Sequence, residues 1–74
     1  MPRLPRVTAK QMVSVLQKCG FAWTRQSGSH AIYKNEEGLR ATVPVHSSTI
    51  LHPKIVKTIL RDANISTADF KKML

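Results

Sequence analysis

The chain has 74 residues, which predicts a single domain over residues 1–74 with a small core, and residues 1–7 form an N-terminal arm. That length excludes a separate cofactor-binding domain and favours an open surface site over an enclosed pocket, so no cofactor is expected. Twelve Lys and Arg residues against four Asp and Glu give a formal net charge of +8, which favours a polyanionic partner.

The charge is unevenly distributed along the chain. Residues 1–35 contain no acidic residue, whereas all the acids lie between Glu36 and Asp69. The acid-free part carries six basic residues, which are Arg3, Arg6, Lys10, Lys18, Arg25 and Lys34. A one-sided positive field of this kind is typical of proteins that bind nucleic acid, although a basic surface kept for solubility is the alternative.

The compartment is inferred from what the sequence lacks. No run approaches the roughly 20 apolar residues of a membrane-spanning helix, and the proline-rich start is too short for a signal peptide. The lone Cys19 has no partner for an internal disulfide and lies on the apolar face of a predicted helix, where a small buried hydrophobe is its usual role. We therefore expect a cytoplasmic protein.

The first predicted element is a helix that begins after Thr8 and ends at Gly20. Thr8 and Gln11 have the spacing of a capping box, and glycine is a common stop signal. Apolar residues recur at helical spacing, with polar residues between them. The predicted inner face contains Ala9, Met12, Val13, Leu16, Cys19 and Gly20.

Three strands are predicted to follow as an antiparallel meander. Residues 21–26 and 30–34 form a hairpin around the turn 27–29. A second polar turn, 35–38, leads to a third strand over 39–45. Because Pro44 cannot donate to a sheet ladder, that strand is expected to be an edge strand or to break near its end.

A second helix is predicted to begin near Pro53, which suits the first turn, and to end at Asn64. Its predicted inner face contains Ile55, Val56, Ile59, Leu60 and Ala63. Ser66 opens a short C-terminal helix. The fold class is therefore α+β, in the order α-β-β-β-α with a short final helix, and a three-stranded antiparallel sheet covered by helices on one face. This is the layout of a double-stranded-RNA-binding domain.

The most informative motif is Gly28-Ser29-His30, which places one imidazole at a tight turn within the basic half of the chain. It stands in the longer run Arg25 to His30, preceded by the helix ending at Gly20 and followed by Val43-Pro44-Val45-His46. From about residue 8 to 70, this set of motifs resembles the HicA family of mRNA interferase toxins. The set is specific, whereas each single motif is weak.

The resemblance implies a function and a partner. HicA toxins have the double-stranded-RNA-binding-domain-like fold, cleave mRNA, use the histidine of this motif as their catalytic residue, and are paired with a HicB-type antitoxin. Because the 2′-hydroxyl of RNA is itself able to attack the adjacent phosphorus when a histidine moves the protons, we expect the cleavage to need no metal. In this chain the histidine of the motif is His30. Many relatives carry a second histidine directly after it, but Ala31 occupies that position here, so an acid and base pair of adjacent imidazoles is not expected.

Other residues are predicted to support His30. Gly28 and Ser29 in the turn, together with Arg25, Lys34 and Lys10, are expected to contact RNA, and the nearby cations would stabilise charge on the phosphate. His46 is a second candidate for substrate contact, whereas His52, before Pro53, is assigned to the helix start. Trp23 and Tyr33 are able to stack on bases, but core packing is expected for at least one of them.

The side of the sheet on which His30 lies, the expectation of no metal, and an alternative function complete the predictions from the sequence. Strand alternation places His30 on the same side as Ile32, which ought to face the helices, so His30 lies at the margin of the core unless a bulge at Gly28 or Ser29 turns it outward. The three histidines and Cys19 lack the close pairs of a zinc site, so no metal is expected. A non-catalytic double-stranded-RNA-binding module, which needs the cations but not His30, is the alternative function.

Overall fold

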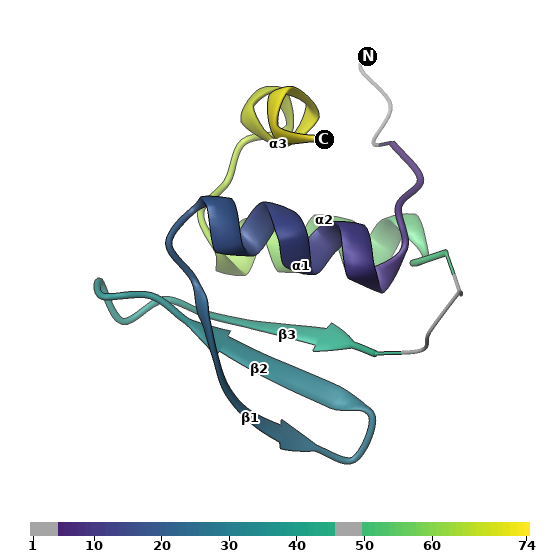
Figure 1. Ribbon diagram of the computed structural model, residues 1–74. Coiled ribbons are helices and arrows are strands. Elements are labelled where there is room, and N and C mark those ends of the chain that lie inside the picture. Colours follow the sequence, from purple (N-terminus) through teal and green to yellow (C-terminus); the bar gives the residue numbers. More distant parts are fainter. Residues whose placement is uncertain (1–4, 46–49) are drawn as a thin grey trace.

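A computed structural model describes residues 5–45 and 50–74 of the chain. Figure 1 shows a sheet below two helices, α1 and α2, with a third helix, α3, on the far side of that pair. The structure has the predicted α+β order, and the sheet has helices on one face only. The elements are α1 (Ala9–Lys18), β1 (Ala22–Ser27), β2 (His30–Lys34), β3 (Arg40–Pro44), α2 (Pro53–Asp62) and α3 (Thr67–Met73).

The first helix begins with the predicted capping box. The backbone N–H of Gln11 donates to Thr8 Oγ1 at 3.2 Å, and the backbone N–H of Thr8 donates to Gln11 Oε1 at 2.9 Å. Each bond satisfies a backbone donor that the first turn leaves unpaired. The inner face differs from the prediction because Val15 is also buried, whereas Val13 and Cys19 are only partly buried. Gly20 is exposed, so its assignment to the inner face was wrong, because it lies past the last helical residue, Lys18.

The sheet is the predicted antiparallel meander, with β2 between β1 and β3. Pro44 is the last residue of β3, an edge strand, so its missing N–H breaks no interior ladder. The sheet packs against the helices through four buried side chains, which are those of Ala31, Tyr33, Ala41 and Val43. Their registers, Ala31 opposite Val43 and Tyr33 opposite Ala41, place all four on one face.

The second helix is capped by His52, whose Nδ1 accepts the backbone N–H of Lys54 at 3.1 Å, and Pro53 is its first residue. Its inner face contains the predicted buried residues Val56, Ile59 and Leu60. Ile55 is 39% exposed, so its assignment to the inner face was wrong. Ile55 comes directly before Val56 in the first turn, at the margin of the apolar stripe, where its side chain meets solvent.

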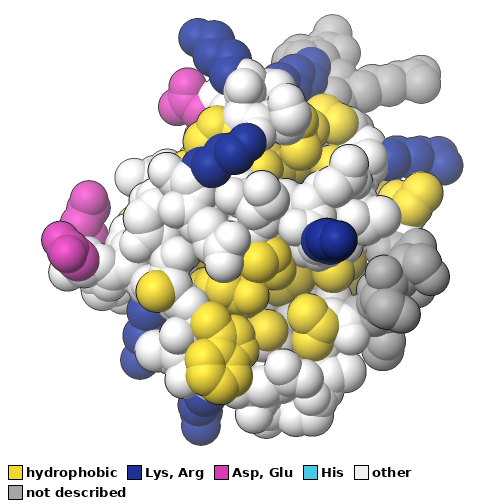
Figure 2. Space-filling view, viewed as in Figure 1, with side chains coloured by type: hydrophobic (Ala, Val, Ile, Leu, Met, Phe, Trp, Pro, Cys, Tyr) yellow, Lys and Arg dark blue, Asp and Glu magenta, His cyan; other side chains and the backbone are white. Residues whose placement is uncertain are grey.

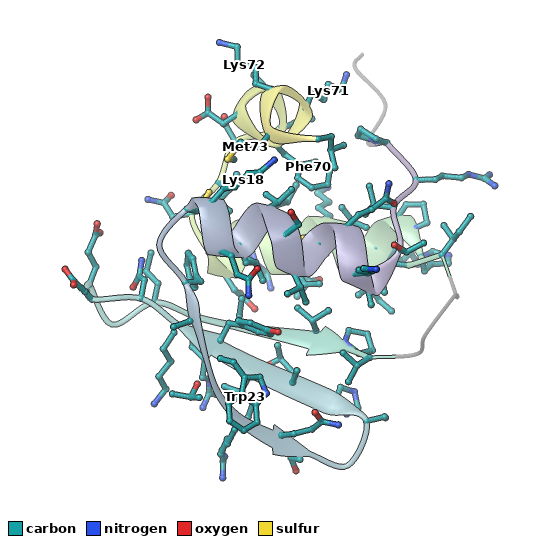
Figure 3. The ribbon with its side chains drawn as sticks, viewed as in Figure 1. Lys18, Trp23, Phe70, Lys71, Lys72 and Met73 are labelled. Carbon is teal, nitrogen blue, oxygen red and sulfur yellow. The ribbon has the colours of Figure 1, made fainter. Side chains whose placement is uncertain are left out.

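The C-terminal helix packs on the outer side of α1 through Phe70, which has no exposed surface. Figure 3 shows Phe70 and Met73 turned toward α1, with Lys71 and Lys72 pointing away from it. The Lys18 ammonium donates to the Met73 carbonyl at 2.8 Å, which ties the end of α1 to the end of α3. Among the residues that the structure describes, no helix has the length and apolar character needed to cross a membrane.

Candidate active site

The turn before His30 consists of Gly28 and Ser29, between paired Ser27 and His30. Gly28 has φ of 59°, a left-handed conformation that glycine adopts without cost and that two-residue hairpin turns require. The Ser29 carbonyl accepts the backbone N–H of Val45 at 2.6 Å, which joins the turn to the residue after β3. His30 is therefore the first residue of the central strand and is anchored from both neighbouring strands.

His30 does lie on the same face as Ile32, but that face points away from the helices. Ala31 and Tyr33 belong to the core cluster under α1 and α2, so the alternating residues His30, Ile32 and Lys34 occupy the opposite face. The prediction that Ile32 faces the helices was wrong. His30 is exposed at the end of the uncovered side of the sheet, not at the margin of the core.

The sheet does contain a bulge, but not at Gly28 or Ser29. The register of β1 against β2 shifts between Trp23 and Arg25, which leaves Thr24 as the extra residue, and Thr24 Oγ1 donates to the Ile32 carbonyl at 2.7 Å. A bulge changes which residues of a strand share a face. Here it places Trp23 opposite Tyr33 on the helix side and Arg25 opposite Ile32 on the other side.

The uncovered side of the sheet, which we name the open face, has three rows of side chains. The first row is Ser27, His30 and Pro44; the second is Arg25, Ile32 and Thr42; the third is Ala22, Lys34 and Arg40. His30, Arg25 and Lys34 therefore share the open face, with Arg25 one row and Lys34 two rows from His30. The sheet adds Arg40, which sequence analysis missed because only the β2–β3 register shows that it lies beside Lys34.

The open face is positively charged. It carries three exposed cations, Arg25, Lys34 and Arg40, which we name the cationic cluster, and no acidic residue in any of the three rows. The only ion pair found among residues 5–45 and 50–74 joins Arg61 to Asp62, so no carboxylate within that part of the chain neutralises the cluster. In Figure 2, acidic side chains lie at the far left and at the top, and Lys and Arg side chains extend from the lower left margin of the sheet.

Of the two other predicted contact residues, Lys10 lies elsewhere in the structure and His46 is not among the described residues. Lys10 is exposed on α1, in the helix layer on the other side of the sheet, so the structure does not bring it to the open face. His46 lies outside the described residues; the last described residue before it, Val45, is bonded to Ser29. Gly28 and Ser29 lie directly beside His30, where Gln26 Nε2 also donates to the Gly28 carbonyl at 3.1 Å.

The aromatic residues divide as expected, since one packs in the core and one does not. Tyr33 is buried, and that burial raises the pKa of its phenol above the ordinary value. Trp23 is 56% exposed, and its register opposite Tyr33 places it on the helix side of β1. Neither ring lies on the open face, so that face has no aromatic surface on which a base would stack.

The lone thiol and the cavity beside it lie away from His30. Cys19 Sγ is 3.3 Å from Met73 Sδ; burial, and secondly the negative charge of Asp69, raise the pKa of the thiol. A cavity of about 210 Å³ lies there too, lined by Cys19, Asp69 and residues of the turn between β2 and β3, at the other end of β2 from His30. Within the described ranges no three His, Cys, Asp or Glu residues are grouped as a metal site.

A comparison with protein families identifies the family of this chain. The family model described as the HicA toxin of bacterial toxin–antitoxin systems matches residues 9–65, from the start of α1 to just past the end of α2. A comparison with curated proteins gave no match. The match covers well over half of the chain and includes the hairpin, His30 and the whole sheet. The chain therefore belongs to the HicA toxin family of bacterial toxin–antitoxin systems.

Proposed function

We propose that this HicA toxin is an endoribonuclease that cleaves mRNA without a metal, with His30 as its catalytic residue. The observation that carries the proposal is the position of His30, exposed at one end of an open face that holds three cations and no acid. Histidine is the side chain whose ordinary pKa lies closest to neutral pH, so it exchanges protons under physiological conditions. A polyanion supplies the negative charge that the face lacks.

The proposed chemistry uses the substrate's own nucleophile. The ribose 2′-oxygen forms a bond to the adjacent phosphorus and loses its proton, while the bond from phosphorus to the 5′-oxygen of the next nucleotide breaks and that oxygen gains a proton. The products are a 2′,3′-cyclic phosphate and a 5′-hydroxyl, and the step consumes no water. His30 either takes the first proton or supplies the second, which is typically worth about 10²- to 10⁴-fold in rate.

The cationic cluster and the turn have supporting roles in this proposal. Arg25 is the cation nearest His30 on the open face, one row away, and stabilises the charge that builds on the phosphate. Gly28 and Ser29 set the direction from which β2 begins, and so the position of the imidazole. Lys10, which was predicted to contact RNA, lies in the helix layer and has no role in this arrangement, whereas contact of His46 with RNA stays a prediction.

The family also implies the regulator and the place of action. A HicB-type antitoxin is the expected partner of a HicA toxin, and we infer that an acidic surface of that antitoxin covers the open face and masks His30. The toxin then acts in the cytoplasm, where its mRNA substrate is found. Release of the antitoxin would expose His30 without any change in the fold of the toxin.

The test compares two exposed histidines. The purified toxin, free of antitoxin, is incubated with an mRNA transcript in EDTA as the wild type, as His30→Ala and as His52→Asn. His52 caps α2 through its Nδ1, and asparagine is a good N-cap residue, so that variant removes an imidazole and keeps the cap. We expect cleavage by the wild type and His52→Asn, and a loss of at least about 100-fold in His30→Ala.

Thermal unfolding of the same proteins shows whether the variants are folded. Cleavage by folded His30→Ala at the wild-type rate would remove His30 from the mechanism. Tight binding of duplex RNA without cleavage by any of the three proteins would favour the alternative, a non-catalytic double-stranded-RNA-binding module.

A further inference from the structure

The open face presents its cations in an order that indicates how RNA lies on it. From one end of β2 to the other, His30 is in the first row, Arg25 is in the second, and Lys34 and Arg40 are in the third. With a strand rise of about 3.3 Å per residue, the third row is roughly 13 Å from His30. One phosphate is too small to contact both ends, so Lys34 and Arg40 meet phosphates other than the one at His30.

We propose that the open face is a binding track for the backbone of single-stranded RNA, in which Lys34 and Arg40 hold the phosphates on one side of the cleaved bond and Arg25 lies between them and His30. This inference rests on the proposed function in taking RNA as the ligand and, for the choice of a single strand, in taking 2′-oxygen attack as the chemistry. Neither Lys34 nor Arg40 forms an ion pair within the described part of the chain, so both are available to phosphate oxygens.

The pairing of Lys34 with Arg40 is a second, independent observation. These two residues stand directly opposite each other on neighbouring strands. Like charges in that position destabilise a sheet, and no acidic residue lies in their row to compensate. The fold alone therefore gains nothing from this pair, whereas a bound phosphate would relieve the repulsion and gain two charged hydrogen bonds.

The composition of the face indicates what part of the RNA it contacts. Ile32, the apolar residue of the middle row, is only 7% exposed, and the aromatic rings of Trp23 and Tyr33 belong to the other side of the sheet. Sheets that read single-stranded RNA by sequence stack bases on exposed aromatic residues. The open face lacks these, so it contacts phosphates and makes binding tolerant of base sequence.

The proposed chemistry favours a single strand over a duplex. Attack by the 2′-oxygen requires that oxygen to stand in line with the departing 5′-oxygen, an arrangement that the regular A-form helix does not provide. A strand held only through its phosphates on a flat sheet is free to adopt it. Shape recognition of duplex RNA, by contrast, uses surfaces that span about 16 base pairs.

The experiment measures RNA affinity in the His30→Ala background, where the RNA stays intact. Arg40→Thr tests the track, and Lys57→Ala, which removes the same charge from the exposed side of α2, is the matched control. Dissociation constants are measured by fluorescence anisotropy with single-stranded RNAs of three unrelated sequences and with one duplex, at several salt concentrations.

We expect Arg40→Thr to weaken single-stranded RNA binding roughly fivefold for all three sequences. The slope of log K against log salt should become less negative by about 0.7, the value for one phosphate contact on a single strand. Its melting temperature should be equal to or higher than that of the parent, because the repulsion with Lys34 is gone. Lys57→Ala should leave the affinity for single-stranded RNA close to that of the parent.

Three results would overturn the track. They are an unchanged affinity in Arg40→Thr, an equal loss in Lys57→Ala, or a loss confined to duplex RNA. An Arg40→Thr protein that binds RNA normally but binds the antitoxin less tightly would assign the face to the protein partner instead. Because binding is read in the absence of cleavage, failure of the track is distinguishable from failure of His30 as the catalytic residue.

Discussion

Replacing Gly28 by Ala tests whether the turn before His30 depends on the backbone freedom of glycine. A Cβ atom at Gly28 would meet no heavy atom within 4 Å, so steric overlap contributes nothing, and the φ of 59° alone sets the cost. A left-handed conformation costs an L-residue about 1–2 kcal/mol. Alanine also lowers the conformational entropy of the unfolded chain, which offsets about 0.4–1 kcal/mol of that cost. The net loss in the free energy of unfolding is therefore about 1 kcal/mol.

That loss corresponds to a fall of about 4–8 °C in melting temperature for a domain of this size. Gly38→Ala is the matched control, because Gly38 has φ of 87°, also has open space around it, and lies in the turn at the other end of β2. Both variants should melt lower by a similar amount. At a temperature where both are fully folded, only Gly28→Ala should cleave RNA more slowly, because strain there is relieved by moving His30.

Circular dichroism melts and initial cleavage rates measure the two effects separately. An unchanged melting temperature in Gly28→Ala would refute the argument from backbone strain. Equal losses of cleavage in both variants would show that the turn has no special relation to His30.

Three further predictions concern the rest of the fold. The rate of Cys19 alkylation, measured against pH, should be half-maximal above pH 9.0, the ordinary pKa of a thiol, because burial and secondly the charge of Asp69 raise the pKa of Cys19. In Asp69→Asn the midpoint should move part of the way back toward 9.0. A midpoint at or below 9.0 in the wild type would contradict this prediction. The raised pKa also means that the thiol's contribution to stability, present below pH 9, is lost as pH rises through the folded value. Phe70→Ala should lower the free energy of unfolding, measured by denaturant titration, by about 3–5 kcal/mol. Leu74 is 49% exposed, so Leu74→Ala should lower it by less than about 0.5 kcal/mol. Similar losses in the two variants would show that α3 is not docked on α1. Thr8→Ala should lose about 1 kcal/mol with the capping box, and no loss would contradict the bonds seen there.

The elements of the fold were predictable because their ends carry local signals. Thr8 with Gln11, Pro53, and Asn64 with its φ of 57° each mark a helix end through their own backbone or side-chain chemistry. The small residues at 27–29 mark the hairpin in the same way. Such signals act within a few residues, so they need no knowledge of the tertiary structure.

The faces of the sheet were harder to predict. Ala31, Ile32 and Tyr33 are all apolar, so the run shows no alternation that would tell which side is inside, and the largest aliphatic residue was assigned to the core. The bulge at Thr24, which moves Arg25 to the open face, has no recognisable sequence signal. Arg40 joins the site only through strand pairing, a contact between segments that local patterns do not reveal.

The central claim is that His30 moves a proton during attack by a ribose 2′-oxygen on its own phosphodiester. The most direct measurement is the chemical analysis of the new ends produced when the purified toxin cleaves an RNA transcript in EDTA. The account predicts a 2′,3′-cyclic phosphate on one product and a 5′-hydroxyl on the other, with neither formed by His30→Ala. Products that carry 5′-phosphates would contradict it.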